Sequence, residues 1–214
     1  MIEAYPVVHI VDDDDTVRDS LQLLLRMRGY RTRTYASGER FIADVEPGAH
    51  GCVVLDLRMP GMQGSEVQAT LQARDIALPI IVLTAHGDAA SARAALKGGA
   101  FDFLEKPVDH DTLVATIDAA HRSDQASHAA ARARSDVERK LARLTPRERE
   151  VLDYVVLGRH NREVAALLGI SPRTVEVYKA RIYEKLQVTR LAELMRLALA
   201  AGIAGPPQPP TGIP

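Results

Sequence analysis

With 214 residues, 46% of them hydrophobic, the chain is long enough for one large domain or two small ones and apolar enough to fill their cores. Its single cysteine, Cys52, excludes a disulfide framework and a cysteine-based zinc site. Charge is nearly balanced overall but unevenly placed, since residues 1–122 have a net charge of −6 and residues 141–214 a net charge of +4. An acidic half joined to a basic half indicates two separate functions, one of which involves binding a polyanion.

The sequence lacks the signs of secretion or membrane insertion. Residues 1–6 include Glu3 and have no basic region of the kind that begins a secretory signal. The longest apolar runs, near residues 80–83 and 197–201, are far shorter than the roughly 20 residues that a membrane-spanning helix needs. We therefore expect a cytoplasmic protein without membrane contact.

Short apolar runs alternate with amphipathic stretches from Val7 to about Asp118, which predicts five strands that are each followed by a helix. The expected strands are residues 7–11, 31–35, 52–55, 78–83 and 101–104. The expected helices are residues 17–28, 38–46, 64–74 and 89–97, and one that starts near residue 109. Such alternation predicts an α/β domain over residues 1–120, with a doubly wound, five-stranded parallel sheet in the order 2-1-3-4-5.

The second half of the chain reads as helical. Residues 121–141 are rich in alanine, arginine and serine, so we expect a solvated helical linker; a coiled-coil seam is the alternative, although alanines would make up most of it. From Leu144 onward the pattern predicts an all-α domain of four helices over residues 142–204. Residues 205–214 contain five prolines and are expected to be a disordered tail.

Polar residues follow the expected strands at the edge where sites form in doubly wound sheets. They are Asp12 and Asp13 after the first strand, Asp56 after the third, Thr84 after the fourth and Lys106 after the fifth. Three neighbouring carboxylates would raise one another's pKa unless a cation compensates them, and an all-oxygen set of few protein ligands favours Mg²⁺. A hydroxyl and an ammonium beside the metal suit phosphoryl oxygens, so a carboxylate here could act as a nucleophile toward phosphorus.

These residues resemble the receiver domain of two-component response regulators, which has a flavodoxin-like fold. The resemblance covers about residues 5–120 and rests on residues 11–13 (VDD), 55–61 (LDLRMPG), 83–85 (LTA) and 105–107 (EKP). It implies that Asp56 is the phosphoacceptor and that Thr84 and Lys106 contact the phosphoryl group. It also implies Mg²⁺ ligands at Asp12, Asp13, Asp56 and the backbone carbonyl of Arg58, a cis Lys106–Pro107 bond, and a switch formed by Thr84 and Phe103.

Other polar residues of this half have structural interpretations. We expect Asp14 and Asp15 to cap and begin the first helix, where the helix dipole favours acidic side chains. His9 lies within a strand, and Cys52 is small and weakly polar, so we expect both to be core residues.

In the basic half, a tight turn at residues 169–171 between two expected helices is typical of a helix-turn-helix, and the helix after it would enter the major groove. The residues resemble the LuxR-type helix-turn-helix of the NarL/FixJ group, and most of all FixJ-like regulators. The match runs through residues 144–152 (LTPREREVL), 161–165 (NREVA), 168–171 (LGIS) and 174–176 (TVE). It implies a transcription factor that dimerises when phosphorylated, through the surface of the fourth helix, fifth strand and fifth helix of the receiver.

The resemblance also places the DNA contacts. Base-facing positions fall on Glu176, Val177 and Ala180, and the expected phosphate contacts are Arg173, Thr174, Lys179 and Arg181. Because Glu176 is acidic and Ala180 is small, we expect few direct base contacts. The implied partners are a cognate sensor histidine kinase, double-stranded promoter DNA, a second copy of the chain and RNA polymerase.

Two other functions stay open at this point. The acidic pocket could belong to an enzyme that turns over phosphate esters, although the sequence offers no second acid or base placed for that reaction. Multiple turnovers of a small phosphate ester would favour the enzyme. The helical half could instead bind protein or RNA as an adaptor. A DNA affinity that does not change with salt concentration would count against a DNA-binding function. We adopt the regulator, whose chemistry is limited to self-phosphotransfer and self-dephosphorylation at Asp56.

Overall fold

The computed structural model describes residues 6–85 and 89–203. The chain divides into two compact units, Met1–His128 and Ala129–Pro214, and this division lies within the residues predicted to form the linker. The tail predicted to be disordered, residues 205–214, lies outside the described residues.

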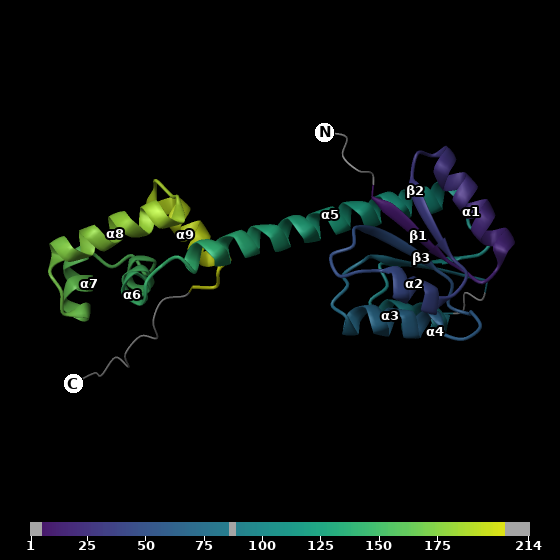
Figure 1. Cartoon of the computed structure of the whole chain (residues 1–214), viewed down its shortest axis with the longest axis horizontal. Coiled ribbons are helices and arrows are strands. Elements are labelled where there is room, and N and C mark those ends of the chain that lie inside the picture. The colour runs from purple at the N-terminus through teal and green to yellow at the C-terminus, as the bar shows by residue number, and fades with distance from the viewer. Residues whose placement is uncertain (1–5, 86–88, 204–214) are drawn as a thin grey trace. The chain divides into compact units, whose positions relative to one another are not determined.

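The first unit is built on the predicted parallel sheet, with strand order β2-β1-β3-β4-β5 among the described residues (Figure 1). The strands are β1 (Val7–Val11), β2 (Arg31–Tyr35), β3 (Gly51–Leu55), β4 (Ile80–Thr84) and β5 (Asp102–Glu105). β1 and β3 pair in parallel with Val7 opposite Gly51 and Val11 opposite Leu55. The residues that follow these two strands therefore meet at one edge of the sheet.

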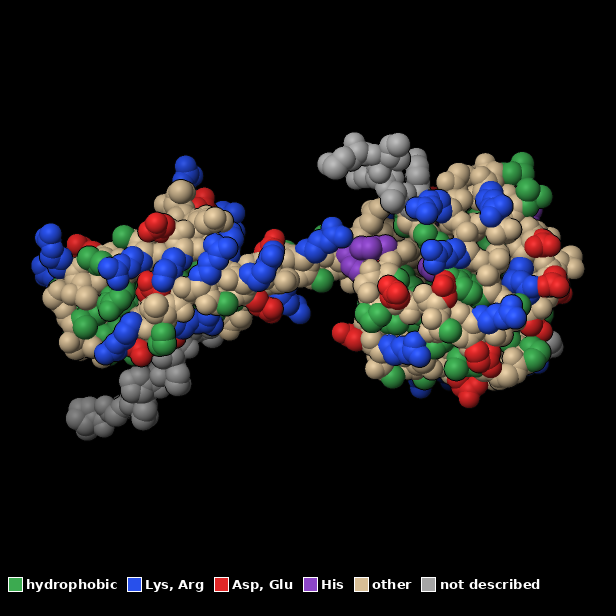
Figure 2. All heavy atoms as spheres, in the orientation of Figure 1, with side chains coloured by type: hydrophobic (Ala, Val, Ile, Leu, Met, Phe, Trp, Pro, Cys, Tyr) green, Lys and Arg blue, Asp and Glu red, His purple; other side chains and the backbone are tan. Residues whose placement is uncertain are grey.

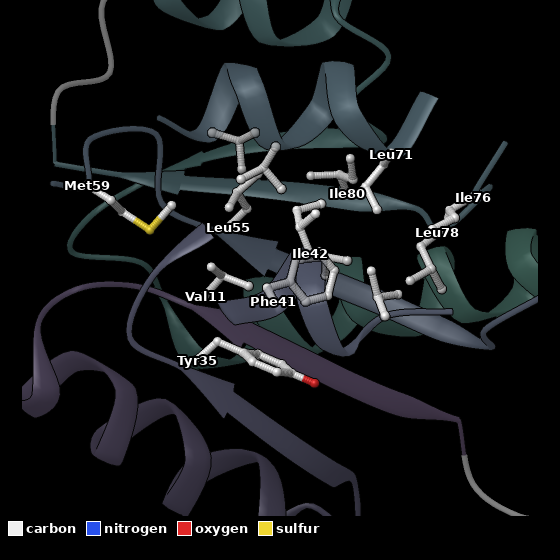
Figure 3. Packing of buried hydrophobic residues seen from close by; sticks show 14 of the residues in the cluster. Val11, Tyr35, Phe41, Ile42, Leu55, Met59, Leu71, Ile76, Leu78 and Ile80 are labelled. Atoms are coloured by element: carbon white, nitrogen blue, oxygen red, sulfur yellow. The ribbon is translucent and has the colours of Figure 1, made fainter. Parts of the chain in front are cut away.

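Helices cover both faces of this sheet, which confirms the doubly wound fold. They are α1 (Asp15–Met27), α2 (Gly38–Asp44), α3 (Gly64–Ala73), α4 (Ala89–Lys97) and α5 (His110–Leu141). One buried cluster joins Val11 and Leu55 of the sheet to Phe41 of α2 and Leu71 of α3 (Figure 3). Alternate strand residues point to the other face, where a second cluster joins the sheet to α1 and α5. Each fully buried leucine contributes roughly 1.5–3 kcal/mol of burial free energy.

Several predicted element boundaries shift by one or two residues. β4 begins at Ile80 rather than residue 78, because Pro79 has no N–H to donate to the strand ladder. α2 ends at Asp44 rather than residue 46, because Val45 is already extended and the residue before Pro47 avoids helical geometry. The expected fifth helix and the helical linker form one continuous helix, α5, of 32 residues.

The second unit contains α6 (Pro146–Val155), α7 (Asn161–Leu168), α8 (Pro172–Leu186) and α9 (Leu191–Ala200). Its core joins Leu152 of α6, Val164 of α7 and Ile182 of α8. α7 ends at Gly169, whose φ of +67° lies in the left-handed region that glycine adopts without strain, and Ser171 then caps α8. The predicted helix-turn-helix is therefore present in this unit.

Within the ranges described, helices that combine the length and the apolar character needed to cross a bilayer are absent.

Candidate functional site

The predicted pocket residues meet at the carboxyl edge of the sheet because each directly follows a strand or ends one. The Asp56 backbone N–H donates to the Val11 carbonyl at 2.9 Å, which holds the residue after β3 beside the end of β1. The Lys106 backbone N–H donates to the Thr84 carbonyl at 2.9 Å, which ties the residue after β5 to the end of β4. Residues far apart in the sequence thus form one pocket.

The Lys106 side chain links two of the carboxylates. Its Nζ donates to Asp12 Oδ2 at 2.6 Å and to Asp56 Oδ2 at 2.8 Å, and the exposed fractions of the three side chains are 17%, 4% and 12%. Burial raises the pKa of Asp12, and the hydrogen bond from Lys106 opposes this rise. Burial alone would lower the pKa of Lys106, but its bonds to the two carboxylates outweigh burial and hold that pKa above its ordinary value. The ammonium therefore stays charged between them.

The carboxylates fit a divalent cation. Asp12, Asp13 and Asp56 each offer an oxygen, and these oxygens all lie within 4.8 Å of one another. One ammonium against three carboxylates leaves an excess of negative charge, and Asp13 is exposed, so solvent reaches the group. An all-oxygen set that leaves room for water suits Mg²⁺. The Arg58 backbone lies beside it, since its N–H donates to Asp56 Oδ1 at 3.1 Å.

The Asp56 carboxylate keeps lone pairs for a further partner. Each of its two oxygens accepts one of the hydrogen bonds above, from Lys106 or from Arg58. An ionised carboxylate has about four lone-pair sites, so each oxygen retains one for a further partner.

The loops around the pocket are held by short local contacts. The Asp14 N–H donates to Asp12 Oδ1 at 3.0 Å, and Arg18 Nη1 donates to the Asp12 carbonyl at 2.6 Å. Asp14 caps α1 by accepting from the Thr16 N–H at 2.8 Å, and Asp15 lies in the first turn, which confirms both interpretations. On the other side, α3 starts with Gly64 so close to the Asp56 carbonyl that a Cβ there would lie 2.5 Å from its oxygen.

The predicted switch residues lie on neighbouring strands. Thr84 ends β4 and is 1% exposed, and Phe103 on β5 is half-buried opposite Val82. Phe103 packs against the cluster that contains Val11 and Leu55. The Lys106–Pro107 peptide bond is cis, as predicted. His9 and Cys52 are both buried in the core, as predicted.

In the second unit, the predicted DNA contacts lie on the outside of α8. Its core-facing residues are Val175, Ile182 and Leu186, and none of these was predicted to touch DNA. The exposed predicted contacts are Arg173, Glu176, Val177, Ala180 and Arg181. The half-buried ones, Thr174 and Lys179, also have partners within the protein.

These partners show how α8 is held. The Thr174 hydroxyl lies 2.8 Å from that of Ser171, the residue that caps the helix, and Lys179 Nζ donates to Asn161 Oδ1 of α7 at 3.1 Å. An ammonium has three donors, so Lys179 keeps two for a phosphate. The sequence did not reveal the Lys179–Asn161 contact, because it depends on how α7 packs against α8, whereas the Ser171–Thr174 contact is local to the start of α8.

Sequence reasoning also missed a partly buried ion pair that joins α6 to α8. Lys185 Nζ donates to Glu148 Oε2 at 2.6 Å, and Glu148 also accepts from the Thr145 N–H at 2.8 Å. Burial alone would raise the pKa of Glu148, but the hydrogen bonds from Lys185 and Thr145 outweigh burial and lower that pKa. Thr145 followed three residues later by Glu148 is a capping-box pattern, and this was the available signal. A further group that was missed brings together His50, Asp124 and His128 in the first unit.

The sheet, the carboxylate pocket and the helix-turn-helix together define a receiver domain followed by a LuxR-type DNA-binding domain. Residues 8–118 match the response regulator receiver domain family, and residues 142–198 match the bacterial regulatory proteins of the luxR family. The chain therefore belongs to the two-component response regulators of the FixJ-like group, and the relatives described next are transcriptional regulators rather than enzymes.

Similarity to known proteins extends over nearly the whole chain. The chain is 44% identical over 204 residues to the transcriptional regulatory protein FixJ of Azorhizobium caulinodans, covering 95% of this chain and 96% of the relative. It is 42% identical to FixJ of Rhizobium meliloti, covering 91% and 96%. Among solved structures, the response regulator StyR aligns with a TM-score of 0.84 at 38% identity, covering 92% of this chain and 99% of that one. Full-length FixJ from B. japonicum aligns with a TM-score of 0.58 at 38% identity, covering 92% and 97%.

Proposed function

We propose that this response regulator is switched on when a sensor histidine kinase phosphorylates Asp56, and that the phosphorylated chain dimerises and binds promoter DNA. The observation that carries the proposal is the position of the Asp56 carboxylate. It is 12% exposed, it shares the Lys106 ammonium with Asp12, and it faces a third carboxylate, Asp13. A carboxylate of this kind is held in one orientation and retains lone pairs for phosphorus.

The transfer we propose is a displacement at phosphorus. An Asp56 oxygen attacks the phosphorus of the kinase phosphohistidine, so a P–O bond forms while the P–N bond breaks. The imidazole leaves with the electron pair of that bond and takes up a proton from solvent. Lys106 and Thr84 then stabilise the phosphoryl oxygens by hydrogen bonding, because an ammonium and a hydroxyl donate to them.

The same carboxylates would bind the metal ion in this proposal. Asp12, Asp13 and Asp56, with the backbone carbonyl of Arg58, would hold Mg²⁺, which supplies positive charge against the phosphoryl oxygens. Asp12 is the buried anchor of this set, and Asp13 is its exposed member. Lys106 limits the repulsion among the acids before any metal binds.

The response would pass from the pocket to its surroundings through Thr84 and Phe103. Thr84 ends β4, and Phe103 on β5 lies opposite Val82, two residues before Thr84. Movement of the threonine toward the phosphoryl group would open space for the ring. We propose that the surface of α4, β5 and α5 then forms the dimer. Two copies would present two α8 helices to double-stranded DNA, as half-site recognition requires.

At the DNA, the exposed basic residues of α8 would contact phosphates, and Glu176, Val177 and Ala180 would face the bases. RNA polymerase is the further partner of a promoter-bound regulator in this proposal, and a cytoplasmic location follows from a DNA target in bacteria. Residues 1–120, 121–141 and 142–204 remain our proposed receiver, linker and DNA-binding domain.

Phosphorylation is tested by intact mass measurement of the full chain after incubation with acetyl phosphate and Mg²⁺. We expect one phosphoryl group on the natural chain, none on Asp56→Asn, and none when Mg²⁺ is replaced by a chelator. Asp75→Asn is the matched control, because Asp75 is an exposed aspartate in a left-handed conformation that asparagine also tolerates. Full labelling of Asp56→Asn would show that the phosphoacceptor lies elsewhere.

A further inference from the structure

We propose that His50, Asp124 and His128 form a second metal site, suited to a borderline transition ion such as Zn²⁺. The three side chains each offer a ligand atom, and these atoms all lie within 4.8 Å of one another. His50 precedes β3, and the other two lie on α5, within the first unit. Figure 2 shows a purple group of histidine side chains on the surface of this unit.

The Asp124 carboxylate is built into the protein but is incompletely satisfied. It is 1% exposed, and its Oδ2 accepts from the Gly51 backbone N–H at 3.1 Å. In the parts of the chain that the structure describes, its Oδ1 is a buried side-chain oxygen that lacks a hydrogen-bond partner. Buried polar atoms nearly always have a hydrogen-bond partner, so a buried carboxylate oxygen whose contact is a 3.3 Å ion pair with His128 Nε2 points to a missing ligand.

Each imidazole has a nitrogen at a ligand-to-ligand distance from one oxygen of the Asp124 carboxylate, and the two histidines use different oxygens. His50 Nδ1 lies 3.4 Å from Asp124 Oδ2, and His128 Nε2 lies 3.3 Å from Asp124 Oδ1. Bonds of about 2.0–2.2 Å from zinc to nitrogen and oxygen imply separations of roughly 3.3–3.5 Å between neighbouring ligand atoms. Two imidazoles and one carboxylate leave a fourth position for water, and the side chains of His50 and His128 are 45% and 24% exposed, so water can reach it.

The two imidazole rings lie against each other, with their centroids 3.7 Å apart, and each has a nitrogen beside the Asp124 carboxylate. A metal bound by both rings would supply one compact positive charge to this buried carboxylate.

This site is chemically and spatially separate from the carboxylate pocket. His50 lies just before β3 and Asp56 just after it, and a strand of five residues spans about 17 Å. Nitrogen donors favour Zn²⁺, whereas the all-oxygen pocket favours Mg²⁺. The two ions can therefore be distinguished by competition.

Binding at this site would hold α5 to the sheet. Asp124 and His128 are one helical turn apart, and His50 belongs to the segment that leads into β3. A metal bound by all three side chains would add a cross-link where Asp124 already accepts a hydrogen bond from the Gly51 N–H. It would resist separation of α5 from the sheet near His128 without touching Asp56.

The test is a calorimetric titration of the full chain with Zn²⁺ in excess Mg²⁺, which keeps the carboxylate pocket occupied. We expect one Zn²⁺ per chain, at least tenfold weaker binding by His50→Ala or His128→Ala, and loss of this binding in the double variant. His110→Ala is the matched control, because His110 is an exposed histidine on the same helix, and it should bind like the natural chain.

A second measurement needs no variant. Zn²⁺ should protect His50 and His128, but not His110, from carbethoxylation by diethyl pyrocarbonate, as read by peptide mass. Equal affinity and stoichiometry in the natural chain and the folded double variant would overturn the proposal. So would failure of the natural chain to bind or be protected at micromolar Zn²⁺, which would leave the group as histidine–aspartate ion pairs alone.

Discussion

The start of α3 beside Asp56, the proposed phosphoacceptor, makes Gly64→Ala a sensitive perturbation. A Cβ at this position would lie 2.5 Å from the Asp56 carbonyl oxygen and 2.8 Å from Leu57 Cα. Both neighbours are backbone atoms, so no side chain can rotate away. Restoring an ordinary contact requires the Asp56 backbone or the first turn of α3 to shift by about half an ångström or more.

Two effects on stability oppose each other in this variant. Forcing a methyl group into a packed site costs about 1–3 kcal/mol, whereas alanine is favoured over glycine in a helix by up to about 1 kcal/mol. We therefore expect a net loss of about 1–2 kcal/mol in the free energy of unfolding. Because misplacing a reacting group by about 1 Å can cost roughly 100-fold in rate, a shift of half that size should slow labelling of Asp56 about tenfold.

Urea unfolding and the rate of acetyl phosphate labelling measure the two effects. Gly98→Ala is the matched control, because a Cβ there lies no closer than 3.3 Å to a described atom and the neighbours need to give by only a few tenths of an ångström. Its stability should fall less than that of Gly64→Ala, and its labelling rate should stay near that of the natural chain. If Gly64→Ala were as stable as the natural chain and were labelled as fast, the close packing of α3 against Asp56 would affect neither stability nor phosphorylation, and this prediction would be wrong.

Three other predictions concern stability and DNA binding. Burial lowers the pKa of His9 from 6.5 to about 4, so between these pH values only the unfolded chain binds this proton. The free energy of unfolding should therefore fall by about 3 kcal/mol as the pH falls from 6.5 to about 4. His9→Gln should lack this part of the pH dependence when urea unfolding is measured at a series of pH values. Parallel pH profiles for both proteins would contradict this. Lys185→Met leaves the Glu148 carboxylate buried without its ammonium and should destabilise the second unit by about 1–3 kcal/mol in thermal unfolding, whereas an unchanged transition would show that the pair contributes little. Arg173→Ala should reduce the magnitude of the slope of log affinity against log salt concentration by about one in a DNA titration. An unaltered slope would show that Arg173 does not contact a phosphate.

The sheet and its pocket were predictable because the signals are local. Apolar runs marked the strands, and the rule that sites form beyond the carboxyl ends of parallel strands brought Asp12, Asp56 and Lys106 together. The exposed face of α8 followed from helical periodicity, which places Val175 and Ile182 on the opposite side.

The features that escaped prediction depend on distances between side chains distant in sequence. Lys106 shares its ammonium between two carboxylates, and Glu148 pairs with Lys185 across two helices; neither pattern is visible in a local window. His50 and Asp124 meet only because α5 packs along the sheet. The continuity of α5 through the expected linker was equally hidden, since an alanine-rich stretch is compatible with a helix of any length.

The reactive pocket draws Asp12, Asp56 and Lys106 from the ends of three different strands, so it exists only after the sheet is complete. A chain that lacks β5 has no ammonium to orient the acids, so under the proposed function we expect it to accept no phosphoryl group. Completion of the sheet would then be a precondition for signalling, and incompletely folded chains would not respond.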